Sequence, residues 1–250
     1  MSAVSHLQYG AFGQGFKFNK PLFLLVLLSV MAIWIAATAA AHAAEPKRIM
    51  LFGDSLLAGY GLSEADGFAN QLQAALAENG QDVTIINASV SGDTTAGGVS
   101  RLTWSLADNP DLVILALGGN DILRAINPAS TRANMETMLQ TFDREGIPVL
   151  VAGMVAPKSL GPAYVAAFDP IYPELADQYD AAYYPFLLDG VAGVPALNQN
   201  DGIHPNGKGV ALMVERMLPV VLEALEQLSA STANSQVAEC SGLRYETKTV

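Results

Sequence analysis

Short apolar runs alternate with amphipathic segments along most of this 250-residue chain. Apolar runs of about four to eight residues between turn residues are typical of buried strands, and apolar positions three and four residues apart indicate helices with one buried face. Strands are expected at 48–52, 83–87, 112–117, 149–153 and 185–188. Helices are expected at 68–78, 130–145 and 207–228. This alternation predicts an α/β fold, with a parallel sheet covered by helices on both faces.

The length of the chain and its hydrophobic content of 51% favour one domain with one core, placed at residues 44–228. Residues 229–250 are polar and are expected to form a mobile tail. Residues 154–184, with four prolines and six aromatic residues, are expected to be irregular. This segment either packs on the sheet edge or forms one wall of an acyl or aryl pocket, and the sequence favours neither role.

The first 43 residues have the pattern of a secretory signal. Lys17 and Lys20 precede an apolar stretch that runs to Ala41, and Ala41-His-Ala43 has small residues where a signal peptidase cleaves. The stretch 22–41 is also long enough, at about 20 residues, to remain as a membrane anchor. The alanine-rich end favours cleavage, which would place a bacterial protein in the periplasm or outside the cell.

Charge and cysteine content exclude several classes of function. Residues 1–43 hold two of the 13 basic residues and none of the 24 acidic ones, so the mature chain would carry 11 against 24, a formal charge of −13. An acidic surface of this kind repels phosphate backbones, which argues against nucleic acid as a partner. Cys240 is the only cysteine, so the chain has neither an internal disulfide nor a Cys/His cluster for zinc. No metal or other cofactor is expected.

A candidate nucleophile follows the first predicted strand. The apolar run 49–52 ends in Gly53-Asp54-Ser55-Leu56, a tight turn that presents Ser55 at the carboxyl end of the strand. Ligands of open α/β sheets bind at that end, so a serine there is placed for nucleophilic attack. The same pattern also fits a serine that caps the next helix.

A base for this serine is available in one place only. His6 and His42 lie in the signal-like segment, which leaves His204 for the folded domain. His204 comes three residues after Asp201, a spacing at which a carboxylate can reach the imidazole and fix its tautomer. We therefore predict a catalytic triad of Ser55, Asp201 and His204. The Gly-x-Ser-x-Gly turn of α/β-hydrolases is absent, so the scaffold is a different one.

Two glycine-rich turns offer donors for an oxyanion hole. Gly92 follows the strand at 83–87 and can bring a backbone N–H close to a reacting carbonyl, while Asn120 follows the strand at 112–117 and carries a neutral side-chain donor. Each turn by itself is also an ordinary βα connection. Because Ser55, Gly92 and Asn120 all follow predicted strands, we expect them at one edge of the sheet, with the Ser55 backbone N–H as the third donor.

Together these blocks resemble the SGNH (GDSL) hydrolase superfamily. The matching motifs are Gly-Asp-Ser-Leu at Ser55, Ser-Gly-Asp-Thr-Thr at Gly92, Gly-x-Asn-Asp at Asn120 and Asp-Gly-Ile-His-Pro at Asp201 and His204. Within the superfamily, residues 47–220 are most similar to the bacterial arylesterase, acyl-CoA thioesterase I and lysophospholipase L1 group. The resemblance implies a three-layer flavodoxin-like fold with strand order 2-1-3-4-5, and a serine hydrolase that forms an acyl-enzyme. Leu57 and Gly119 depart from the common pattern and bear on substrate preference.

The resemblance implies aryl esters, acyl-CoA thioesters or lysophospholipids as substrates. Export favours esters, because acyl-CoA is a cytoplasmic metabolite. The alternative within the superfamily is a carbohydrate acetylesterase with a shallow polar cleft. A flavodoxin-like nucleotide-binding protein is a further alternative, but the chain has neither Gly-x-Gly-x-x-Gly nor a Walker lysine motif. Asp54 and Asp121 could form an acid pair for glycoside hydrolysis, although we expect each to organise its own turn by hydrogen bonds to backbone N–H groups.

Overall fold

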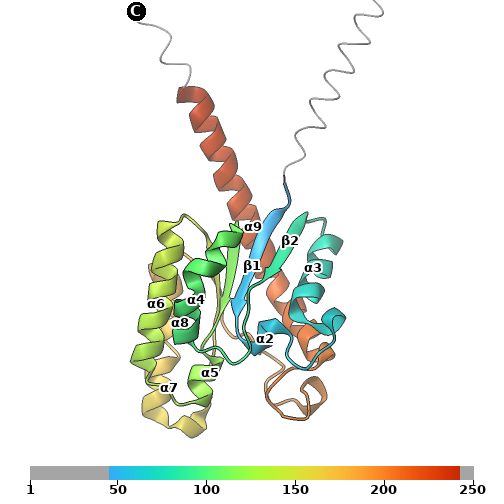
Figure 1. The fold of residues 1–250 in the computed structure, drawn as a ribbon, viewed down its shortest axis with the longest axis vertical. Helices are drawn as coiled ribbons and strands as arrows, with labels where there is room; N and C mark the ends of the chain where they lie inside the picture. Colours follow the sequence, from blue (N-terminus) through green and yellow to red (C-terminus); the bar gives the residue numbers. More distant parts are fainter. Residues whose placement is uncertain (1–44, 243–250) are drawn as a thin grey trace, which may run out of the picture. The chain divides into compact units, whose positions relative to one another are not determined.

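The computed structural model describes residues 45–242, with side chains as far as residue 231. Its centre is a parallel sheet in the order β2-β1-β3-β4-β5 (Figure 1). The strands are β1 (Lys47–Gly53), β2 (Val83–Asn87), β3 (Leu112–Ala116), β4 (Val149–Ala152) and β5 (Ala182–Tyr184). This confirms the predicted fold class and the strand order that the family resemblance implied.

Helices cover both faces of the sheet. One face carries α3 (Phe68–Glu78) and α9 (Gly207–Gly242), which pack against each other, and the other carries α4 (Thr95–Ser105), α6 (Pro128–Arg144), α7 (Pro162–Phe168) and α8 (Ile171–Gln178). The short helices α2 (Ser55–Ala58) and α5 (Gly119–Leu123) lie at the carboxyl ends of β1 and β3. Short 3₁₀ turns span Glu64–Asp66, Leu106–Asp108, Lys158–Leu160 and Pro195–Leu197.

The two-sided cover explains the continuous apolar runs of the sequence. Every residue of β3 and β4 is buried, as are the last five residues of β1, because each strand contacts helices on both faces. On α9 the buried side chains recur three and four residues apart, which turns one stripe of the helix toward the sheet. They are Val210, Met213, Val214, Met217, Val221, Ala224 and Leu225.

The last strand and the segment before it differ from the prediction. The strand is Ala182–Tyr184 and not 185–188, since Pro185 has no N–H to donate to a ladder. Residues 154–184 are also not irregular, because they contain a 3₁₀ turn and the helices α7 and α8. Pro162 occupies the first turn of α7, and Pro170 is the N-cap residue of α8. At these positions a proline interrupts no helical hydrogen bond.

The last helix is longer than predicted. It continues through Gly242, whereas the polar composition after Leu228 had indicated a tail. Residues 229–241 contain neither proline nor glycine, so their polarity alone does not end a helix. The predicted signal segment, residues 1–43, lies outside the described residues. Within residues 45–242, no helix combines the length and the apolarity that crossing a membrane requires.

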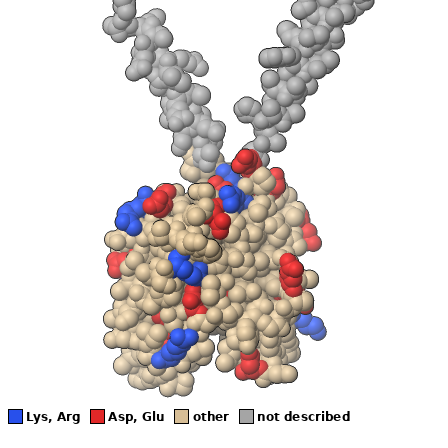
Figure 2. Space-filling view, viewed as in Figure 1, with Lys and Arg blue, Asp and Glu red and all other residues tan. Residues whose placement is uncertain are grey.

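Charged side chains are sparse and dispersed on the described part of the surface that Figure 2 shows. Acidic and basic groups lie among larger uncharged areas, and neither sign gathers into a patch on this face. This distribution agrees with a chain of which 15% is charged.

Candidate active site

Three turns meet at the carboxyl edge of the sheet, each directly after a strand. β1 leads into Ser55, β2 into the turn at Gly92 and β3 into Asn120. All three residues line one cavity of about 600 Å³, and so does His204. The structure thus brings the predicted residues to one edge, because the strands are parallel and their crossovers share one hand.

The turn at Ser55 is held by its neighbours on both sides. Asp54 caps α2, with its carboxylate accepting the Leu56 N–H at 3.0 Å, so Ser55 begins the helix with its side chain free to face the cavity. Gly53 is required by close packing, because a Cβ there would lie 2.9 Å from both the Ala116 carbonyl oxygen and a methyl group of Leu57. The serine is therefore fixed by β1, β3 and α2 together.

Ser55, His204 and Asp201 form a continuous hydrogen-bonded chain. The distance from His204 Nε2 to Ser55 Oγ is 2.9 Å, and the distance from His204 Nδ1 to Asp201 Oδ2 is 2.6 Å. Asp201 also accepts the backbone N–H groups of Ile203 and His204, at 2.9 and 3.0 Å. The hydrogen bonds from the His204 backbone and side chain lower the pKa of Asp201 from 3.8 to about 2. This carboxylate is thus ionised wherever the imidazole needs an acceptor.

One aromatic contact of His204 was not predicted from the sequence. The Tyr60 ring lies beside the His204 ring, with 4.7 Å between their centroids. Tyr60 belongs to the loop after α2 and is 53% exposed, so it covers one side of the imidazole at the mouth of the cavity. The sequence offered only a tyrosine between two glycines, a pattern that does not point to any contact.

Gly92 lies at the third position of a tight turn. Asp93 N–H donates to the Val90 carbonyl at 3.1 Å, and Gly92 has φ of 84°, which a non-glycine residue adopts only with strain. Among the described residues, no acceptor binds the Gly92 N–H. Its carbonyl accepts a hydrogen bond from Arg124 Nη2 at 2.9 Å. The turn therefore leaves one backbone donor unused at a residue that lines the cavity.

Asn120 follows a turn whose shape depends on Gly118. Gly118 has φ of 116°, and a Cβ there would lie 1.9 Å from the Tyr172 hydroxyl, which donates to the Leu117 carbonyl at 2.9 Å. Asn120 Nδ2 donates to Asp54 Oδ2 at 3.2 Å. A primary amide carries two N–H donors, so the second remains for a ligand in the cavity.

Asp54 and Asp121 do not form an acid pair facing the cavity. Asp54 is 1% exposed, and burial raises its pKa from 3.8 to about 6 although Leu56 and Asn120 donate to it. It organises its own turn, as expected. Asp121 does not, because it accepts the backbone N–H of Thr95 at 2.9 Å and the hydroxyls of Thr95 and Thr131 at 2.5 and 3.0 Å. It joins α4, α5 and α6 behind the site.

The rest of the cavity is mostly apolar, with Ser91 and Asn198 as its further polar lining residues. Much of its wall comes from α5 and from the segments 154–157 and 186–193. The large apolar side chains that line it are Leu56, Ile122, Leu123, Met154, Val155, Phe186, Leu188 and Ile203. In the described part of the chain, no group of three or more His, Cys, Asp or Glu side chains is arranged to hold a metal ion.

A parallel α/β sheet with a Ser–His–Asp chain at its carboxyl edge defines the class of serine hydrolases. The comparison with known proteins is more specific. The model of the GDSL-like Lipase/Acylhydrolase family matches residues 51–212, and the chain belongs to this family. It is thus a hydrolase of acyl esters.

Individual relatives cover most of the chain. It is 41% identical to Esterase TesA of Pseudomonas aeruginosa over 71% of this chain and 89% of that protein. It is 36% identical to the Arylesterase of Vibrio mimicus, over 72% of this chain and 90% of that protein. Among solved structures, the SGNH-hydrolase family esterase AlinE4 is 45% identical, with a TM-score of 0.61 over 72% of this chain and 97% of that chain.

Proposed function

We propose that this chain hydrolyses carboxylic esters with apolar acyl or aryl groups through an acyl-enzyme on Ser55. The observation that carries the proposal is the series of hydrogen bonds from Ser55 through His204 to Asp201, in which Ser55 and His204 line a mostly apolar cavity. Hydrogen bonds of 2.9 and 2.6 Å link the Ser55 hydroxyl to the His204 imidazole and the imidazole to the Asp201 carboxylate, which supports the roles of nucleophile, base and orienting group in acyl transfer.

The reaction follows from these contacts. Ser55 Oγ attacks the substrate carbonyl carbon while His204 Nε2 takes the hydroxyl proton, and His204 then gives this proton to the leaving oxygen. Water then attacks the acyl carbon while His204 Nε2 takes its proton, and His204 returns this proton to Ser55 Oγ as the acyl–oxygen bond breaks, which releases the acid and free Ser55. Asp201 holds the imidazole in the tautomer that leaves Nε2 unprotonated before each attack. No cofactor enters these steps.

The charge that develops on the carbonyl oxygen needs donors in fixed positions. We assign this role to the backbone N–H groups of Ser55 and Gly92 and to the side-chain amide of Asn120. The Gly92 N–H is unused in the turn, and Asn120 keeps one N–H after donating to Asp54. Donors that are already oriented stabilise the oxyanion without reorganisation during the reaction.

The walls of the cavity support an apolar acyl or aryl group over a sugar. Apart from the catalytic residues and Asp54, the charged side chains of the described residues do not line it, and its volume of about 600 Å³ lies in the range of small-molecule sites. The names of the relatives, an esterase and an arylesterase, agree with this preference. A protein of Escherichia coli that is 34% identical is named thioesterase 1/protease 1/lysophospholipase L1, so thioesters and lysophospholipids are further candidate substrates.

Two variants test the nucleophile and the base. Ser55→Ala and His204→Ala should each lower kcat on p-nitrophenyl butyrate by several orders of magnitude, because each removes a member of the triad. Ser100→Ala, which removes an exposed hydroxyl on α4, is the matched control and should keep full activity. Near wild-type turnover by Ser55→Ala would refute the mechanism.

The substrate class is tested separately. Values of kcat/KM should be compared for p-nitrophenyl esters of increasing chain length, acyl-CoAs and acetylated sugars. We expect the highest values on medium-chain or aryl esters. Activity confined to acetylated sugars would refute the apolar preference and support the carbohydrate acetylesterase alternative, while leaving the triad intact.

We also propose that the enzyme is exported after cleavage close to Ala44, on the evidence of the signal-like pattern in residues 1–43. Intact-mass measurement of the protein from a bacterial host tests this, since the mature form should begin at Ala44 or Glu45. The mass of the full chain in the membrane fraction would establish an uncleaved anchor.

A further inference from the structure

The loop that carries Gly92 is fastened along the end of β1. Ala88 N–H donates to the Leu51 carbonyl and Val90 N–H to the Gly53 carbonyl, both at 3.0 Å. Ser89 Oγ donates to the Leu51 carbonyl at 3.1 Å. The loop therefore runs beside β1 beyond the end of β2, which brings the Gly92 turn next to the Ser55 turn.

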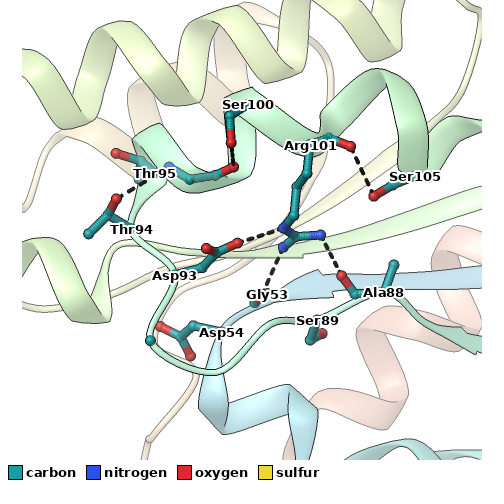
Figure 3. Close-up of polar contacts among 12 residues, drawn as sticks. Gly53, Asp54, Ala88, Ser89, Asp93, Thr94, Thr95, Ser100, Arg101 and Ser105 are labelled. Atoms are coloured by element: carbon teal, nitrogen blue, oxygen red, sulfur yellow. Dashed lines mark hydrogen bonds and ion pairs between the residues drawn. The ribbon is translucent and has the colours of Figure 1, made fainter.

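Arg101 of α4 contacts the same two segments, the end of β1 and the loop after β2 (Figure 3). Its Nε donates to Asp93 Oδ2 and its Nη1 to the Ala88 carbonyl, each at 2.5 Å, and its Nη2 donates to the Gly53 carbonyl at 3.1 Å. The guanidinium carbon lies 3.9 Å from the centroid of the Phe52 ring. One planar group thus contacts β1, the loop after β2 and the residue that follows Gly92.

The contacts of Arg101 are mostly shielded from water. The side chains of Arg101 and Asp93 are 15% and 17% exposed. Gly97 makes room for the carboxylate, since a Cβ there would lie 2.4 Å from Asp93 Oδ1. A largely buried ion pair contributes little net stability, because both ions must lose water, so stability alone does not account for this cluster. The guanidinium group reaches its three acceptors from three different nitrogens held in one plane, whereas the three donors of a lysine ammonium group all lie on one nitrogen at the end of a flexible stem.

We propose that Arg101 is a positioning residue for ester hydrolysis, which sets the distance between the Ser55 and Gly92 N–H groups. Gly53 precedes Ser55 by two residues, and Asp93 directly follows Gly92, so Arg101 binds next to both oxyanion donors without lining the cavity. This inference rests on the function proposed above. A displacement of about 1 Å at a catalytic group is enough to lower a rate about 100-fold.

The test compares variants that remove different parts of the contact. Arg101→Gln should lower kcat on p-nitrophenyl butyrate by about 10- to 100-fold with KM changed less than about threefold, because donors are displaced while the cavity walls stay in place. Arg101→Lys should give an intermediate kcat. Asp93→Asn should lower kcat less than Arg101→Gln, because Arg101 keeps its two carbonyl acceptors. Arg132→Gln, which breaks the exposed ion pair with Glu174 between α6 and α8, is the matched control and should keep wild-type kcat.

A second measurement separates positioning from general damage to the fold. In ¹H–¹⁵N spectra of isotope-labelled protein, Arg101→Gln should shift the Gly92 amide signal while leaving the amide signals of α9 unchanged. Thermal unfolding gives the folded fraction used to correct kcat. Wild-type kcat per folded molecule in Arg101→Gln would overturn the proposal, as would an unmoved Gly92 signal.

The outcomes also distinguish this inference from the proposed function. If Arg101→Gln does not fold, Arg101→Lys and Asp93→Asn decide, and wild-type kcat in both overturns the inference. If Ser55→Ala is inactive while the Arg101 and Asp93 variants are normal, only the positioning role fails. If Ser55→Ala is active, the proposed function itself fails.

Discussion

Replacing Asp54 with asparagine should make the protein more stable at neutral pH and less active. Asp54 is 1% exposed, and burial raises its pKa from 3.8 to about 6. The folded state therefore binds a proton at this carboxyl more tightly than the unfolded state does. Above pH 6 the ionised form lowers the free energy of unfolding, by about 3 kcal/mol for a pKa difference of about two units. A neutral side chain removes this penalty.

The hydrogen bonds of Asp54 oppose part of the gain. Asparagine at this position can still accept the Leu56 N–H, but its own NH₂ group then faces the NH₂ group of Asn120. One buried donor loses its acceptor, at a cost of about 1–3 kcal/mol. The expected net effect at pH 7.5 is a gain of about 0–2 kcal/mol. Because Asn120 loses its anchor, we expect kcat to fall by about tenfold or more.

Urea denaturation at two pH values provides the assay. The raised pKa makes the wild-type protein relatively more stable below pH 3.8, and this contribution is lost as the pH rises through 6. The stability advantage of Asp54→Asn over wild type should therefore be about 2 kcal/mol larger at pH 7.5 than at pH 4. Asp143→Asn, at an exposed position on α6, controls for the loss of one negative charge.

Two results would refute the reasoning about Asp54. An advantage that is equal at both pH values would show that Asp54 has the same pKa in the folded and unfolded states. A loss of more than about 3 kcal/mol at pH 7.5 would show that the carboxylate stabilises the fold by its hydrogen bonds more than its burial destabilises it.

Further predictions concern an oxyanion donor, the orienting carboxylate of the triad and the packing of α4. Asn120→Ala should lower kcat by roughly two to three orders of magnitude with little change in unfolding temperature, and loss of folding with normal turnover per folded molecule would make Asn120 structural. Asp201→Ala should lower kcat less than His204→Ala does, because some imidazole still adopts the required tautomer; equal losses would contradict a purely orienting role. Gly98→Ala should destabilise the fold by about 1–3 kcal/mol, because the new Cβ would lie 2.4 Å from a methyl group of Leu117. Chemical denaturation measures this, and unchanged stability would show that α4 moves away from the sheet at no cost.

The central strands, and the grouping of the candidate site residues, were predictable from sequence because each depends on local pattern. The buried run 49–52 and the turn at Ser55 are contiguous in the chain, and Asp201 and His204 are three residues apart. Parallel strands bring their following turns to one edge, so the meeting of Ser55, Gly92 and Asn120 followed from topology. The three residues do line one cavity, and their catalytic roles remain the proposal that the variants test.

The errors occurred where composition was taken as a guide to backbone shape. The prolines of residues 154–184 suggested an irregular segment, yet Pro162 and Pro170 lie at helix starts, where a missing N–H does no harm. The polar residues after Leu228 suggested a tail, yet they continue α9. Polar residues indicate that a segment is exposed to solvent. They do not end a helix, which requires a residue such as proline or glycine that disfavours the helical backbone.

Arg101 could not be identified from the sequence. Its acceptors are a carboxylate eight residues away and two backbone carbonyls, at Ala88 and Gly53, which carry no sequence signal. The one available hint was a single arginine on α4 after two glycines, on a helix that had to pack against a sheet. Asp121 was placed in its own turn for a similar reason, because its partners Thr95 and Thr131 belong to other helices.

Part of the cavity wall comes from other stretches of chain than the reacting groups. Met154 and Val155 follow β4, and Phe186 and Leu188 follow β5, whereas the triad and the oxyanion donors follow the first three strands or lie in the loop before α9. These two segments can therefore change without a substitution in the triad or at the oxyanion donors. Under the proposed function, exchanging segments 154–157 and 186–193 between family members should alter acyl-chain selectivity while the triad and the oxyanion donors keep their sequence.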